Sequence, residues 1–279
     1  MLKNKLTISE IQAKKISKTK FTMVTVYDFP MASIVEKSSI DMILIGDSLG
    51  KIIQGFDNTM SVSLEDIIYH LKIVRRGAPN KFIVADMPFI PYQIDIKEVI
   101  GNAQSLIING ADCVKIEGGA EVSETIKAVV QSGIPVIAHI GITSHTNDII
   151  MGNCQERTQS SMIAQKLITD AKALEEAGAF SIVLQFIPNK LTAIIDKQLH
   201  IPTIGYGAGP DTSGQNLNAY GLLGILDKSA TKYVKQYASL GEEILRSFNK
   251  WNDETEKGIF PASEHCFIME YDEFKNYSQ

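Results

Sequence analysis

The sequence has no long apolar run and few cysteines. No stretch approaches the roughly 20 consecutive apolar residues with which a helix spans a bilayer. Its first residues, MLKNKLT, lack the apolar segment of a secretion signal. Cys113, Cys154 and Cys266 are odd in number and far apart, without a CxxC pair or metal-ligand spacing, so we expect reduced thiols. These absences predict a soluble cytoplasmic protein with no membrane partner.

The chain also lacks a basic stripe. It carries 27 Lys and Arg against 32 Asp and Glu, a net charge of −5. The densest basic segment, residues 3–20, has no interleaved aromatic residues, which is typical of a solvated helix and linker. We therefore expect no nucleic-acid partner.

What the sequence does contain is a series of short runs rich in Val, Ile and Leu, bounded by turn residues. The runs are continuously apolar, as expected of parallel strands that are covered on both faces. The predicted strands are residues 21–28, 42–48, 82–88, 113–119, 135–143, 181–188, 201–209 and, with the weakest pattern, 220–226.

Amphipathic segments separate these runs. Residues 61–77 contain Ser63 as a helix N-cap, with Asp66 three residues later, and end at Gly77. The helical segments 96–112 and 160–179 also close near a glycine that suits a helix C-cap.

Eight β-then-α units without a clear linker predict a single α/β domain, a (βα)8 TIM barrel with parallel strands. A doubly wound open sheet is the alternative. In this interpretation residues 1–279 form one domain, with the barrel at about 20–227 and a helical tail and closing segment at 228–279.

Polar side chains follow most of the predicted strands. The carboxyl ends of barrel strands converge on one face, where chemistry gathers. Several carboxylates there would repel one another, so a divalent cation with oxygen ligands, such as Mg²⁺, is the simplest source of positive charge. Lys115 shares a strand face with Glu117 and would meet an anionic substrate group. The collected residues are Asp47, Ser48, Asp86, Lys115, Glu117, His139 and Gln185.

Most of these residues also have a structural interpretation. Asp47 and Asp86 could cap the helices that follow them. Lys115 could be an ion-pair partner of Glu117, and His139 could be an internal histidine with satisfied hydrogen bonds. The glycines of GYGAG, at 205–209, suit a phosphate cradle or a turn with close backbone approach equally well.

Six segments resemble the ketopantoate hydroxymethyltransferase family: MILIGDSLG, QGFDNTMSVSLEDIIYHLKIVRRGAP, VADMPF, NGADCVKIEGG, IPVIAHIGIT and IPTIGYGAG. The resemblance covers most of the chain and includes the closing GIFPASEH. It implies a Mg²⁺-dependent barrel of the phosphoenolpyruvate mutase and isocitrate lyase superfamily that forms large homo-oligomers.

The family transfers a one-carbon (hydroxymethyl) unit from 5,10-methylenetetrahydrofolate to C3 of 3-methyl-2-oxobutanoate, a step of pantothenate biosynthesis that gives 2-dehydropantoate. The metal-site residues that the resemblance implies are Asp47, Asp86 and Glu117. The substrate-binding residues that it implies are Ser48, Lys115 and His139.

The chain departs from the family at the catalytic base. The family's sixth strand ends in Leu-Glu, and that glutamate removes the C3 proton; the matching residue here is Gln185, whose amide has no useful basicity. The loop SHTNDIIMGNCQERT adds His145, a candidate replacement base with an ordinary pKa of about 6.5. Ser213-Gly214-Gln215 replaces the family's Asp-Gly-Gln.

Three functions follow from this pattern. The chain catalyses the family reaction with a relocated base, or it performs other metal-enolate carbon–carbon chemistry on a different 2-oxo acid. The third alternative is a catalytically silent homologue that binds ligand.

Overall fold

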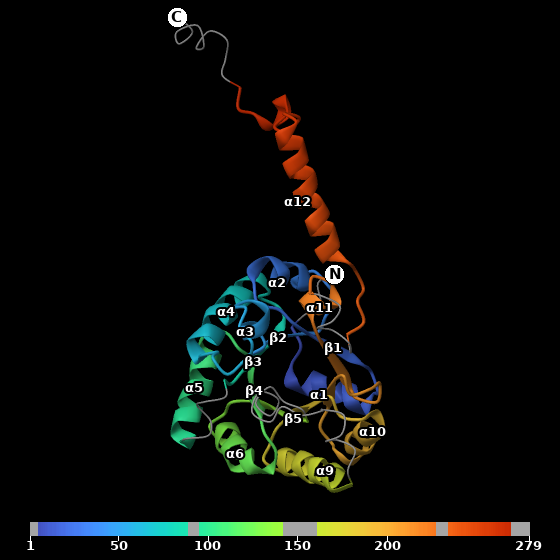
Figure 1. Ribbon diagram of the computed structural model, residues 1–279. Coiled ribbons are helices and arrows are strands. Elements are labelled where there is room, and N and C mark those ends of the chain that lie inside the picture. Colours follow the sequence, from blue (N-terminus) through green and yellow to red (C-terminus); the bar gives the residue numbers. More distant parts are fainter. Residues whose placement is uncertain (1–4, 89–94, 142–160, 227–233, 269–279) are drawn as a thin grey trace, which may run out of the picture. The chain divides into compact units, whose positions relative to one another are not determined.

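A computed structural model describes residues 5–88, 95–141, 161–226 and 234–268. Eight parallel strands close into a barrel in chain order, and β8 pairs with β1 (Figure 1). The predicted (βα)8 barrel is confirmed, and the alternative of an open sheet is wrong. The strands are β1 (Phe21–Thr25), β2 (Met42–Ile45), β3 (Phe82–Asp86), β4 (Cys113–Glu117), β5 (Val136–Gly141), β6 (Ser181–Gln185), β7 (Thr203–Tyr206) and β8 (Gly214–Asn218).

The eighth strand does not lie where the sequence predicted it. Residues 220–226, predicted as a strand, contain the short helix α11 (Ala219–Leu222) followed by turn residues, and β8 comes before them. The buried positions of β8 include Asn216 and Asn218, so this strand has no continuous apolar run. Its backbone pairing with β1 and β7 closes the barrel despite its polar interior side.

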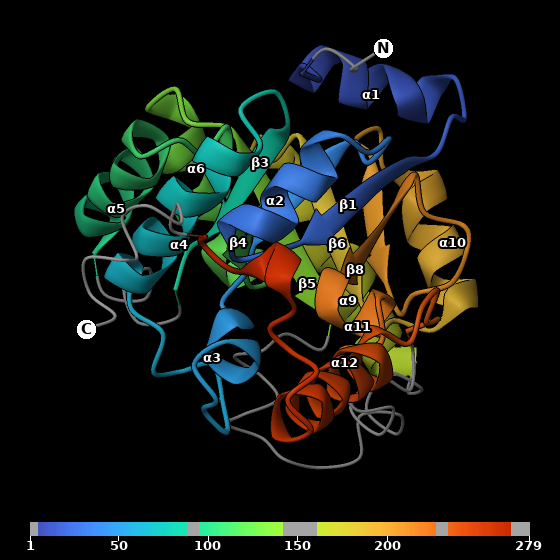
Figure 2. The same cartoon turned by 90° about the horizontal axis from the view of Figure 1, so that it is seen from above.

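Helices follow the strands and cover their outer faces (Figure 2). The predicted cap of α4 is confirmed, because the Ser63 hydroxyl accepts a hydrogen bond from the Asp66 amide and the Asp66 carboxylate accepts one from the Ser63 amide. The helices before β8 are α1 (Ile8–Ile16), α2 (Phe29–Glu36), α3 (Leu49–Ile52), α4 (Leu64–Gly77), α5 (Ile96–Ile108), the 3₁₀ helix η2 (Ala120–Val122), α6 (Ser123–Gln131), α9 (Ser161–Glu176) and α10 (Asn189–Gln198).

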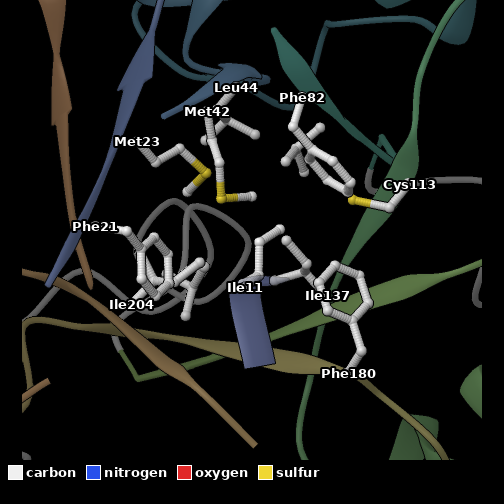
Figure 3. Close-up of a cluster of buried hydrophobic side chains, with 12 residues drawn as sticks. Ile11, Phe21, Met23, Met42, Leu44, Phe82, Cys113, Ile137, Phe180 and Ile204 are labelled. Atoms are coloured by element: carbon white, nitrogen blue, oxygen red, sulfur yellow. The ribbon is translucent and has the colours of Figure 1, made fainter. Parts of the chain in front are cut away.

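Apolar side chains fill the barrel at the strand starts. Ile11 of α1 is fully buried and lies among side chains from several strands (Figure 3). The first residues of β1 to β4, namely Phe21, Met42, Phe82 and Cys113, all belong to this cluster. Asp47, Asp86 and Glu117 are buried at or directly after the ends of β2, β3 and β4, where the sequence predicted the site.

The chain divides into two compact units, Met1–Ala219 and Tyr220–Gln279, and the whole barrel lies in the first. The second contains α12 (Leu240–Glu256), which confirms a helical tail, and the 3₁₀ helix η4 (Ser263–His265). The single domain over residues 1–279 stays a prediction. No helix in the described part of the chain has the length and apolar character to cross a membrane.

Candidate functional site

Five of the predicted site residues lie together at the ends of β2 to β5. Strand register places Asp86 beside Lys115, and Glu117 beside His139. Asp47 follows β2, and its backbone amide donates a 3.0 Å hydrogen bond to Asp86 Oδ2. All five side chains are buried, at 5% exposure or less. Such burial of ionisable groups is costly unless they compensate one another.

Lys115 lies at the centre of this cluster. Its ammonium is 2.8 Å from Asp86 Oδ1 and 3.1 Å from Glu117 Oε1. His139 Nδ1 lies 2.9 Å from both Lys115 Nζ and Glu117 Oε1, and its tautomer decides which of the two it bonds. The buried Nε2 of His139 has no hydrogen-bond partner in the described part of the chain. His139 is thus held through Nδ1, whereas its Nε2 has no bond to the described residues.

The cluster carries more negative than positive charge. Burial and the facing carboxylates of Glu117 and Asp86 raise the pKa of Asp47 well above its ordinary value. Burial also raises the pKa of Asp86, although the Lys115 ammonium lowers it. Burial opposes the charge of Lys115, but the carboxylates of Asp86 and Glu117 outweigh it and raise the pKa of this lysine. The lysine therefore stays charged at neutral pH.

The donor set fits a hard divalent cation. Three carboxylates against one ammonium leave two negative charges when all are ionised, and oxygen donors are the ligands that Mg²⁺ prefers. Lys115 holds Asp86 and Glu117 in the present arrangement, and in the described residues no group of three metal-binding side chains converges on one point.

Two of the structural interpretations can now be compared with the contacts. The N-cap of α3 is Ser48, so Asp47 does not take that role. Lys115 is an ion-pair partner of Glu117, as that interpretation predicted. Its contact with a substrate stays a prediction, as do the metal-binding roles of the three acids.

Gln185 ends β6 on the same side of the barrel as the cluster. It pairs with Gly141 of β5 and Tyr206 of β7. Gly141 has φ +113°, and a methyl group placed on it would lie 2.1 Å from the carbonyl oxygen of Gln185. Only glycine fits there, so the ends of β5 and β6 approach each other closely.

The glycines of GYGAG serve close packing. Gly207 has φ +61°, and an added Cβ would lie 2.5 Å from the Phe186 ring. Gly209 has φ +86°, and an added Cβ would lie 2.6 Å from Asn189. These contacts support the interpretation of close backbone approach at a turn over that of a phosphate cradle. His145, the candidate replacement base, lies outside the described residues.

The sequence analysis missed a polar group beside the cluster. The hydroxyl of Tyr27 lies 2.7 Å from Ser48 Oγ, and Asn218 Nδ2 donates a 2.7 Å hydrogen bond to the same hydroxyl. Burial raises the pKa of Tyr27, so its phenol stays protonated. Tyr27 lay inside a predicted strand, and Asn218 lay in a strand that the apolar pattern did not identify, which is why only Ser48 was singled out.

Comparison with known proteins gives a family match over most of the chain. A model of the ketopantoate hydroxymethyltransferase family matches residues 5–263. The 3-methyl-2-oxobutanoate hydroxymethyltransferase of Heliobacterium modesticaldum is 44% identical over 273 residues, covering 97% of this chain and 98% of that protein. The enzyme of the same name from Clostridium novyi is 44% identical over 267 residues, covering 95% of this chain and 97% of that protein.

Solved structures of the phosphoenolpyruvate mutase and isocitrate lyase superfamily share the fold. A phosphonopyruvate hydrolase in complex with oxalate and Mg²⁺ aligns with a TM-score of 0.63 at 14% identity, covering 98% of both chains. A 2,3-dimethylmalate lyase aligns with a TM-score of 0.60 at 14% identity, covering 97% of this chain and 94% of the other.

Proposed function

The chain belongs to the ketopantoate hydroxymethyltransferase family, and from this premise we propose that it transfers a hydroxymethyl unit to C3 of 3-methyl-2-oxobutanoate. The proposed donor is 5,10-methylenetetrahydrofolate, and the product is 2-dehydropantoate, an intermediate of pantothenate biosynthesis. The C3–H bond breaks, a bond from C3 to the one-carbon unit forms, water supplies the hydroxyl group, and tetrahydrofolate leaves.

The observation that carries this proposal is the buried cluster of Lys115, Asp86, Glu117 and His139 at the strand ends. A 2-oxo acid has a charged carboxylate and a neighbouring polar keto oxygen. In a buried site the carboxylate needs an opposite charge, and the keto oxygen needs a hydrogen-bond donor or a cation. Lys115 supplies a permanent positive charge. The buried Nε2 of the His139 ring, which has no hydrogen-bond partner among the described residues, would supply a polar contact to the substrate.

We propose that Asp47, Asp86 and Glu117 hold Mg²⁺. This cation, when bound, would act as a Lewis acid on the keto oxygen and make the C3 proton more acidic. The three acids would offset its charge. The Ser48 hydroxyl would donate a hydrogen bond to the substrate carboxylate.

Proton removal from C3 needs a base other than Gln185. The amide accepts and donates hydrogen bonds but takes no proton at neutral pH. We propose that His145 takes this proton, since an imidazole is half-neutral near pH 6.5. Loss of turnover in His145→Ala would support this role, and full turnover in that variant would exclude it.

The test is product formation from 3-methyl-2-oxobutanoate and 5,10-methylenetetrahydrofolate, followed by NMR with Mg²⁺ and with EDTA. The proposal expects 2-dehydropantoate only when donor and metal are both present. Product without the folate donor would refute this reaction. An Asp86→Asn variant, which keeps the side-chain shape, should show the loss seen with EDTA.

Gln185 favours a second candidate, different metal-enolate chemistry on another 2-oxo acid. Turnover of a 2-oxo acid panel without folate would support it. A catalytically silent homologue is the third candidate, and binding of 2-oxo acids without any proton exchange would favour it. The cytoplasmic location and the homo-oligomer stay predictions, the second testable by sedimentation.

A further inference from the structure

The hydroxyl of Ser48 has an unusual environment for its position. Ser48 precedes α3 with φ −54° and ψ −12°, a helical conformation, whereas a serine whose side chain caps a helix has an extended backbone. The Ser48 side chain makes no capping hydrogen bond. Instead, Ser48 Oγ lies 2.7 Å from the Tyr27 hydroxyl. A group other than the helix therefore fixes the direction of this side chain.

The residues around the pair keep Tyr27 in place. Tyr27 is fully buried, and His70 Nδ1 lies 2.7 Å from its backbone carbonyl oxygen. The next residue, Asp28, caps α2 through a 2.8 Å hydrogen bond from the Met31 amide. The backbone on both sides of the phenol is thus anchored, so the hydroxyl has little freedom to follow Ser48 if Ser48 turns away.

The hydrogen bond from Asn218 indicates which hydroxyl donates in the contact between Tyr27 and Ser48. Its Nδ2 can only donate, and it donates to the Tyr27 oxygen at 2.7 Å. An oxygen that accepts in this way is polarised toward donating its own proton, and Ser48 Oγ lies in reach of that proton. When Ser48 accepts from Tyr27, the Ser48 hydroxyl proton is left for a further acceptor.

The space next to Ser48 is also defined. A Cβ on Gly46 would lie 3.0 Å from Ser48 Oγ and 3.3 Å from Asp86 Oδ2. Because Gly46 has no side chain, Ser48 Oγ and Asp86 Oδ2 can both lie close to the position that a Cβ would occupy. A ligand that contacts Asp86 would lie close to the Ser48 hydroxyl.

We propose that Asn218 and Tyr27 form a one-way donor relay that makes Ser48 a hydrogen-bond donor to the carboxylate of the bound 2-oxo acid. Tyr27 and Asn218 are positioning residues in this proposal, since they act through Ser48. The inference rests on the proposed function for the identity of the ligand. The relay itself rests on the contacts within the protein.

The first test needs no ligand. In a crystal structure of Tyr27→Phe, the Ser48 side chain should change its rotamer, because the hydrogen-bond partner that fixes its direction is gone. A Ser48 side chain that keeps its direction in this variant would overturn the relay. This result is informative even if the protein binds no 2-oxo acid.

The second test measures the dissociation constant of 3-methyl-2-oxobutanoate with Mg²⁺ by calorimetry for the full chain. Tyr27→Phe and Ser48→Ala should each weaken binding about tenfold, and Asn218→Leu should weaken it less. The double variant of Tyr27 and Ser48 should be no weaker than either single variant, because both changes remove one donor. Effects that multiply in the double variant would contradict the relay.

The control is Tyr69→Phe, which removes the hydroxyl of an exposed tyrosine on α4. Its dissociation constant should match the unmodified protein. Absence of measurable binding by the unmodified protein would refute the proposed function, whereas normal binding with an unchanged constant in a folded Tyr27→Phe variant would refute the relay alone.

Discussion

The ammonium of Lys115 lies 2.8 Å from Asp86 Oδ1, and both side chains are buried at the ends of adjacent strands. Removing the lysine would leave buried carboxylates without their nearest positive charge. Lys115→Met is therefore expected to lower the free energy of unfolding by about 3–5 kcal/mol, measured by urea denaturation with EDTA.

Lys127 offers a matched control for that substitution. It pairs with Glu124 at 4.0 Å, but both side chains are more than half exposed. Lys127→Met should change the free energy of unfolding by less than about 1 kcal/mol. Equal losses of unfolding free energy in Lys115→Met and Lys127→Met would show that the buried ion pair contributes no more to stability than the exposed one.

The raised pKa of Asp47 should make the stability of the protein depend on pH. This pKa is raised above the ordinary 3.8 by burial and by Glu117 and Asp86, so the folded state binds the proton more tightly than the unfolded state. Stability without metal should fall as pH rises through that folded pKa. Asp47→Asn should therefore raise the melting temperature at pH 8 in EDTA, and the gain should shrink toward pH 4.

Addition of Mg²⁺ should favour the unmodified protein over Asp47→Asn in melting temperature. Mg²⁺ should raise the melting temperature of the unmodified protein at pH 8 and have a smaller effect on Asp47→Asn. Asp211→Asn, at an exposed position, should respond like the unmodified protein. A lower melting temperature for Asp47→Asn in EDTA at both pH values would contradict a raised pKa of Asp47 in the folded state.

Gly141 tests the close approach of β5 and β6. Gly141→Ala combines a φ of +113° with a methyl group 2.1 Å from the carbonyl oxygen of Gln185. Gly133→Ala has a comparable φ of +89° but meets nothing within 4 Å. We expect a loss of about 1 kcal/mol for Gly133→Ala and a clearly larger loss for Gly141→Ala in urea denaturation. Similar losses would mean that the strand ends separate easily.

Gln185→Glu should restore a base at the strand end. General base catalysis is worth about 10²–10⁴ in rate, so exchange of the C3 proton of 3-methyl-2-oxobutanoate should accelerate by about that factor. Gln185→Leu, which removes the amide without adding a base, is the control and should give no acceleration. If Gln185→Glu were no faster than Gln185→Leu, position 185 would not face C3 of the substrate.

Seven strands were predictable because their residues form continuous apolar runs, a pattern that parallel barrel strands share. β8 was not, since Asn216 and Asn218 occupy its buried positions and its identity depends on pairing with β1 and β7. The acids and Lys115 were predictable as residues that end apolar runs. The relay was not, because Tyr27 and Asn218 are 191 residues apart and meet only when the barrel closes.

The ion pair of Lys115 shows a second limit of the sequence. The sequence analysis left two partners open for the lysine, a substrate anion and Glu117, and the structure places its ammonium between Asp86 and Glu117. Distances between strand ends decide which partner a flexible lysine meets, and no residue pattern contains those distances. The two roles are compatible if Asp86 and Glu117 hold a cation, since Lys115 would then be available to a substrate anion.

The most direct test of the proposed function is exchange of the C3 proton of 3-methyl-2-oxobutanoate in D₂O with Mg²⁺, followed by NMR on the unmodified protein. Exchange that disappears in EDTA is the predicted result, and it would show that a base other than Gln185 serves the family chemistry. No exchange, with the ligand bound by calorimetry, would contradict the proposal and leave the site to another reaction or to binding alone.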